Sequence, residues 1–180
     1  MKIRMMALAT VLAATASVAH AGGTPDAGIA KKLDAAGLKY EVDGDGDYKL
    51  LFEAEGDRTQ IVWVRSSVET LGNMRIREVM AIGGKMPTMG KDDGVGMAAT
   101  IALTSTTVLA VAALADANEK KLGGWVLKGK GDDQALYFVA QVPADLSAGD
   151  LETVLGSVAR SADKFEQTVE SFTEAEKDKY

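Results

Sequence analysis

The stretch YEVDGDGDYKLLFEAEG, Tyr40 to Gly56, decides the fold class because it predicts a turn between two strands. After the turn, Tyr48, Leu50 and Phe52 occupy every second position. This spacing of apolar residues is typical of a strand with one buried face. Asp-Gly pairs favour tight hairpin turns, because both residues tolerate positive φ. The stretch therefore predicts a β-hairpin.

Four more strand-like runs follow in the chain. They are QIVWVRSSV (60–68), NMRIREVMAI (73–82), GGWVLKGK (123–130) and ALYFVAQV (135–142). The first two are separated by ETLGN and the last two by GDDQ, and connections rich in Gly, Asp or Asn are typical of turns. We therefore expect an antiparallel meander. Trp63 and Trp125 lie within these runs, and we expect both to be packing residues at core-facing positions.

A short helix is expected before the first strand, within TPDAGIAKKLDAAGLKY. Thr24 is the expected N-cap, and Gly37 is expected to end the helix at its C-terminus. Ile29 and Leu33 share one face, because residues four positions apart are neighbours on a helix surface. We expect this face to pack on the sheet.

The last strand-like run is followed by the helix with the clearest pattern. Ser147 and Asp150 form a capping-box pattern at its start. One apolar stripe runs through Leu151, Val154, Leu155, Val158, Ala162, Phe165, Val169 and Phe172. The complete order is α-β-β-β-(β)-α-β-β-α, which predicts an α+β fold: an antiparallel meander with helices packed on it.

The central helix of this order is expected within the uncharged segment Val95 to Ala115. Its apolar residues recur at near-helical spacing, whereas its four threonines and many alanines make it only weakly apolar. We therefore expect a helix laid on the sheet rather than a membrane span, and it could serve as a buried helix or as a dimer interface. GVGMAA at its start matches a dinucleotide fingerprint, but it does not directly follow a strand as that site requires.

The N-terminus has the anatomy of a secretory signal peptide over residues 1–21. Lys2 and Arg4 precede an apolar run, and Ala19-His20-Ala21 offers a small-residue cleavage site. We expect cleavage before Gly22, which leaves one domain (22–172) and a charged tail (173–180). The product would be periplasmic or secreted, without stable membrane insertion.

Cleavage also changes the chemistry that the chain can perform. It removes two of the 20 basic residues and none of the 26 acidic ones, so the formal charge falls from −6 to −8. An acidic domain repels phosphate backbones, which argues against a nucleic-acid partner. The chain has no cysteine, and its one histidine leaves with the peptide. This excludes Ser-His-Asp and Cys-His catalysis and histidine- or thiolate-bound zinc and haem. We expect no cofactor and no enzymatic activity, since a hydrolase would have to work with carboxylates alone.

The order of elements resembles the YbjN family, a domain similar in fold to type III secretion chaperones. The resemblance is carried by LDAAGLKYEVDGDGDYKLLF at the front and KLGGWVLKGKGDDQALYFVAQVPADLSAGDLETVLGSVARSADKF at the back. It spans roughly Ile29 to Val169. The resemblance implies a regulatory or chaperone-like protein without catalytic residues.

The aspartates of the first turn allow a second interpretation, a calcium loop through Asp43, Asp45 and Asp47. An EF-type loop needs a bidentate glutamate at position twelve. That position holds Ala54 when the loop starts at Asp43, and Phe52 when it starts two residues earlier. We therefore expect a hairpin turn and no metal site, with weak calcium binding as the alternative.

Arg75 and Arg77 are the candidate partner-binding residues, because they project from one face of a strand in an acidic protein. The competing interpretation is an ordinary cross-strand ion pair with Glu53 or Glu55. Together these features predict an exported domain that binds a protein or peptide and could form a homodimer. The alternative is a small-ligand carrier that uses the space between the sheet and the helix of residues 95–115.

Overall fold

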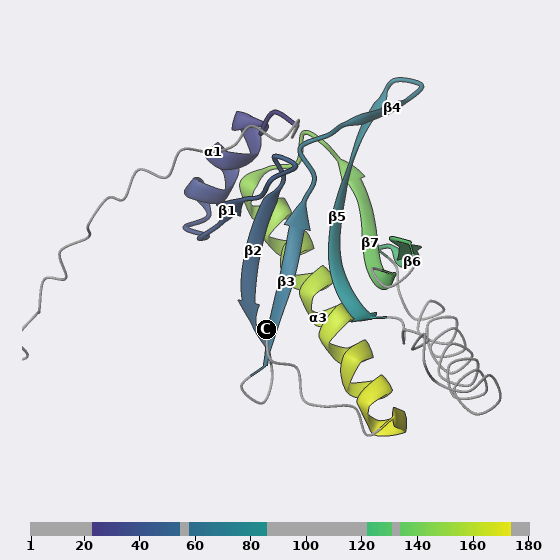
Figure 1. Ribbon diagram of the computed structural model, residues 1–180. Helices are drawn as coiled ribbons and strands as arrows, with labels where there is room; N and C mark the ends of the chain where they lie inside the picture. The colour runs from purple at the N-terminus through teal and green to yellow at the C-terminus, as the bar shows by residue number, and fades with distance from the viewer. Residues whose placement is uncertain (1–22, 55–57, 86–121, 131–133, 174–180) are drawn as a thin grey trace, which may run out of the picture.

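The computed structural model describes residues 23–54, 58–85, 122–130 and 134–173, with side chains up to residue 168 (Figure 1). Its helices are α1 (Ala27–Ala35) and α3 (Ala148–Thr173). Its strands are β1 (Glu41–Val42), β2 (Tyr48–Glu53), β3 (Thr59–Val64), β4 (Glu69–Leu71), β5 (Met74–Lys85), β6 (Gly124–Lys128) and β7 (Ala135–Pro143).

All seven strands belong to one antiparallel sheet with the order β1-β2-β3-β5-β7-β6, and β4 pairs with β5 beside this path. The predicted α+β fold with an antiparallel sheet is thereby confirmed. The β6–β7 hairpin joins the meander through β7, so the later strand lies inside and β6 forms the edge. The predicted helix of residues 95–115 lies outside the described residues.

One predicted strand is divided in the structure. The run of residues 60–68 ends as a strand at Val64, and β4 begins at Glu69, inside the predicted connection ETLGN. The break occurs because Ser66 turns toward the β1–β2 turn. Its backbone N–H donates to Asp47 Oδ1 (2.7 Å), and its hydroxyl donates to the Gly46 carbonyl (2.6 Å).

The hydrophobic core lies between one face of the sheet and the two helices α1 and α3 (Figure 1). Sheet residues at alternate positions face it, as the sequence pattern predicts: Tyr48 and Leu50 are buried, whereas Leu51 is exposed. The helical stripe is also confirmed over the part with described side chains, and its buried members are Leu151, Val154, Leu155, Val158, Ala162 and Phe165. Val169 and Phe172 lie beyond the described side chains.

The predicted helix ends are right in one helix and partly wrong in the other. At the start of α3, Ser147 Oγ accepts the backbone N–H of Asp150 (3.1 Å), as expected of the capping box. In α1 the N-cap is Asp26 rather than Thr24, because Asp26 Oδ1 accepts the backbone N–H of Gly28 (2.8 Å). Gly37 follows α1 with φ of +67°, which matches its predicted role.

The two tryptophans lie on opposite faces of the sheet. Trp125 packs on the core side, with its ring 4.1 Å from Phe165 and 5.3 Å from Phe138 between centroids. Gly83 lies beneath this ring, and a Cβ there would overlap the ring carbons of Trp125. Trp63 contacts Tyr137 edge-to-face at 6.3 Å, on the other face. The expected core-facing position of Trp63 was wrong, because Val62 and Val64 take that side of β3.

Candidate functional site

The most exposed apolar side chains in the described ranges include a pair at the tip of the β4–β5 hairpin. This hairpin, which we call the arm (residues 69–76), extends past the ends of the neighbouring strands (Figure 1). Leu71 and Met74 are register partners on either side of the turn, and they are 63% and 59% exposed. The arm therefore carries two adjacent large apolar groups into solvent, where they gain nothing from the core.

The local sequence explains why the chain forms an arm here. Gly72 has φ of +60° in the two-residue connection between Leu71 and Met74, a conformation that favours glycine in a tight hairpin. The arm is fixed at its base, where the Arg75 carbonyl accepts the backbone N–H of Ala144 (2.9 Å). In the described part of the chain, β4 pairs with β5 alone, so one of its two edges is open.

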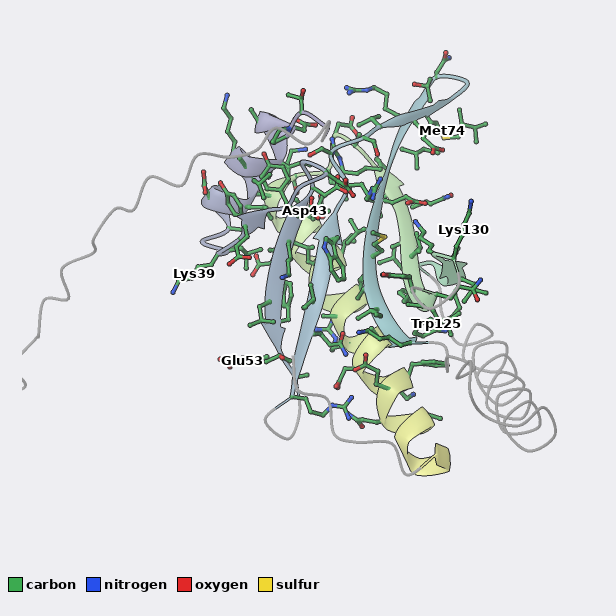
Figure 2. The ribbon with its side chains drawn as sticks, in the orientation of Figure 1. Lys39, Asp43, Glu53, Met74, Trp125 and Lys130 are labelled. Atoms are coloured by element: carbon green, nitrogen blue, oxygen red, sulfur yellow. The ribbon has the colours of Figure 1, made fainter. Side chains whose placement is uncertain are left out.

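The two predicted partner-binding arginines have different surroundings. The side chain of Arg75 is exposed on the arm, opposite Thr70. Arg77 is only 4% exposed, because its guanidinium donates to the carbonyls of Arg65 and Ser66 and to Asp26 Oδ2 (2.5 Å). Arg77 thus connects Asp26 with the segment that follows β3 inside the fold. Its carboxylate partner is Asp26 rather than the expected glutamates. Met74, the exposed neighbour of Arg75 in the chain, is labelled in Figure 2.

The aspartates of the first turn are held within a hairpin, which confirms the predicted turn. Asp43 Oδ1 accepts the backbone N–H groups of Asp45 and Asp47, both at 3.0 Å. Asp47 is buried, and its carboxylate pairs with Arg65 (3.0 Å) while accepting the N–H of Ser66. Over the described ranges, no group of three or more acidic or histidine side chains is arranged to hold a metal ion.

Asp26 links this region to α1 and gives a prediction about pH. Burial by itself raises the pKa of Asp26. The Gly28 N–H and the Arg77 guanidinium together lower this pKa by a larger amount, so the pKa of Asp26 is below the ordinary 3.8. A lowered pKa in the folded state stabilises the fold above pH 3.8, and this stabilisation is lost as the pH falls through the folded-state value.

We therefore expect the stability advantage of the protein over its Asp26→Asn variant to be constant near neutral pH and to shrink below 3.8. Asparagine is a good N-cap, so the substitution removes the charge and keeps the cap. Urea unfolding at a series of pH values measures this difference. An advantage that is independent of pH down to full protonation would show that Asp26 is not ionised in a favourable pair.

The sequence did not identify Leu71 as part of a surface site, because ETLGN was interpreted as a connection. The signal was a large apolar residue directly before a Gly-Asn turn. Such a residue has no place in an ordinary polar turn and contributes no buried area to the core.

No protein-family model matches the chain, and no curated protein matches it in sequence. Among solved structures, the crystal structure of YbjN from E. coli is similar to this chain, with 10% sequence identity and a TM-score of 0.47. The match covers 80% of this chain and 89% of the YbjN chain. It concerns the arrangement of the backbone, and neither a ligand nor a partner follows from it.

The membrane question was raised by a segment outside the described ranges. In the ranges that are described, no helix has both the length and the apolar composition needed to cross a bilayer.

Proposed function

We propose that the chain is an exported, non-enzymatic domain that binds an extended segment of a protein or peptide through the arm. The observation that carries this proposal is the exposed Leu71–Met74 pair on a protruding hairpin. Exposed apolar groups that adjoin one another are a feature of protein interaction sites, whereas single exposed apolar residues are ordinary.

The structure of the arm favours the binding of an extended segment. The open edge of β4 offers backbone groups to an added strand, which is a common way of binding extended peptides. Leu71 and Met74 supply apolar contact, and Arg75 beside them favours an acidic residue in the bound segment. A role as a chaperone-like or regulatory protein of the YbjN type is the finer form of this proposal, and the sequence resemblance is its basis. Export rests on the signal-peptide anatomy of residues 1–21.

An array of extended peptides that combine apolar and acidic residues tests this proposal, with the protein lacking residues 1–21 as the probe. We expect the double variant Leu71→Ser, Met74→Ser to weaken the best peptide by about 2 to 3 kcal/mol, which is roughly 30- to 150-fold. The matched control is Leu51→Ser, because Leu51 is 64% exposed on β2, away from the arm.

Two results would oppose the proposal. If the arm variant and the Leu51 control lose the same amount of peptide binding, the peptide binds to exposed apolar side chains in general and not to the arm. If no peptide binds and light scattering shows a monomer at high concentration, the small-ligand carrier becomes the leading function. A dimer that dissociates in the arm variant would mean that the segment bound by the arm belongs to a second copy of the chain.

A further inference from the structure

The two methionines in the described ranges have very different surroundings. Met80 is 9% exposed in the middle of β5, and its Sδ accepts a hydrogen bond from Lys128 Nζ (3.6 Å). Met74 begins the same strand, is 59% exposed, and lies at the projecting end of the arm in Figure 2. The thioether of Met80 is therefore covered, whereas Met74 is open to reagents in solution.

The neighbours of Met74 give it little protection. Every residue from Leu71 to Arg75 is exposed. In the described part of the chain, β4 pairs with β5 alone, and Met74 pairs with Leu71 next to the turn. A close-packed interior excludes water and small solutes, and Met74 lies outside such an interior.

An accessible methionine thioether reacts with hydroperoxides. The sulfur lone pair attacks one oxygen of the hydroperoxide, the S–O bond forms as the O–O bond breaks, and the proton passes to the departing oxygen. The thioether is oxidised to the sulfoxide, and the hydroperoxide is reduced to an alcohol, or to water when the oxidant is hydrogen peroxide. Two thiols reverse the reaction, which yields the thioether, a disulfide and water.

Oxidation changes the property on which the arm depends, its pair of exposed apolar groups. The Cβ atoms of register partners in an antiparallel pair are about 4.5 to 5.5 Å apart, so a sulfoxide at Met74 would stand beside Leu71. The sulfoxide is polar and chiral, unlike the thioether. Burying it against an apolar side chain of a bound peptide costs the free energy of removing its oxygen from water.

We propose that Met74 is an oxidation site at which a hydroperoxide converts the arm from a peptide-binding form to a weakly binding form, and that reduction of the sulfoxide restores binding. The selectivity for Met74 over Met80 follows from their exposures alone. The consequence for binding rests on the function proposed for the arm. The two parts are tested by separate measurements.

Peptide mass spectrometry after treatment with hydrogen peroxide tests the selectivity, with the protein lacking residues 1–21. Cleavage after Lys and Arg places Met74 in the peptide 66–75 and Met80 in the peptide 78–85, so the oxygen added to each is counted separately. We expect Met74 to be oxidised at least about tenfold faster than Met80 in the folded protein, and the two rates to become similar in urea. Equal rates in the folded protein would overturn the proposal.

Peptide affinity before and after oxidation tests the consequence for binding. The readout is the ratio of the affinities of the reduced and oxidised forms of each protein, measured with the best peptide from the array. We expect a ratio of about ten for the unsubstituted protein, because one large apolar contact is lost. Met80→Leu should give the same ratio, and Met74→Leu should give a ratio near one. Treatment with the two epimer-specific sulfoxide reductases and a thiol should return the ratio to one.

Three results of the affinity measurement would oppose the proposal. An equal ratio in Met74→Leu and the unsubstituted protein would place the effect at another methionine. Oxidation of Met74 without any change in affinity, or a loss of affinity that the reductases do not reverse, would overturn the change of binding form. If the reduced protein binds no peptide, the function proposed for the arm fails and the effect on binding fails with it. Selective oxidation of Met74 is then still decided by the mass spectrum.

Discussion

Replacing Phe165 by alanine is expected to lower the free energy of unfolding by about 3 to 5 kcal/mol. Phe165 is 2% exposed in the middle of α3 and packs against Trp125 across the edge of the sheet. The substitution removes the ring and leaves a cavity that the rigid sheet can only partly fill. Because Trp125 loses its nearest aromatic neighbour, its fluorescence should shift as well.

Urea unfolding measures this effect, with Leu51→Ala as the control. Leu51 is exposed on β2, so its truncation should change the stability by no more than about 0.5 kcal/mol. A cost below about 1 kcal/mol for Phe165→Ala would mean that α3 does not pack on the sheet in solution.

Replacing Arg77 by methionine is expected to lower the free energy of unfolding by about 3 kcal/mol. Methionine retains most of the aliphatic volume, but the carbonyls of Arg65 and Ser66 lose their donors and Asp26 loses its cation. The expected cost lies at the lower end for buried pairs, because the Asp26 side chain is 35% exposed and water partly solvates it.

Arg75→Met is the matched control, since it makes the same substitution two residues away at an exposed position. We expect a change within about 0.5 kcal/mol there. Adding Asp26→Asn to Arg77→Met should remove part of the penalty, because the carboxylate then needs no cation. Equal costs at Arg75 and Arg77 would refute the internal role of Arg77.

The features that the sequence predicted well are those set by local periodicity. Alternation in β2 and the stripe of α3 identify the buried face, because each pattern repeats over several turns or pleats. Leu50 and Phe165 were therefore correctly predicted as interior residues. The α1 cap was predicted two residues too early, since Thr24 and Asp26 are both good caps and propensity does not choose between them.

Features that depend on tertiary contacts could not be predicted. Nothing local distinguishes Arg77 from Arg75; the difference is that Asp26 at the start of α1 lies over Arg77. Gln60 lies two residues before Val62 in β3, so both side chains point to the same face of the sheet. The burial of Gln60 could therefore have been predicted from the alternating pattern. Its pairing with Glu166 could not, because the two residues are 106 positions apart and meet only when α3 packs on the sheet.

Amide hydrogen exchange with and without a peptide selected on the array is the most direct test of peptide binding by the arm. If the arm binds an extended segment, residues 69–71 should become protected on binding, because the open edge of β4 gains hydrogen-bond partners. Residues 50–53 of β2 pair with residues 59–62 of β3, at the end of the strands away from the arm, and should exchange at unchanged rates. Protection at β2 or β6 with none at β4 would contradict the account.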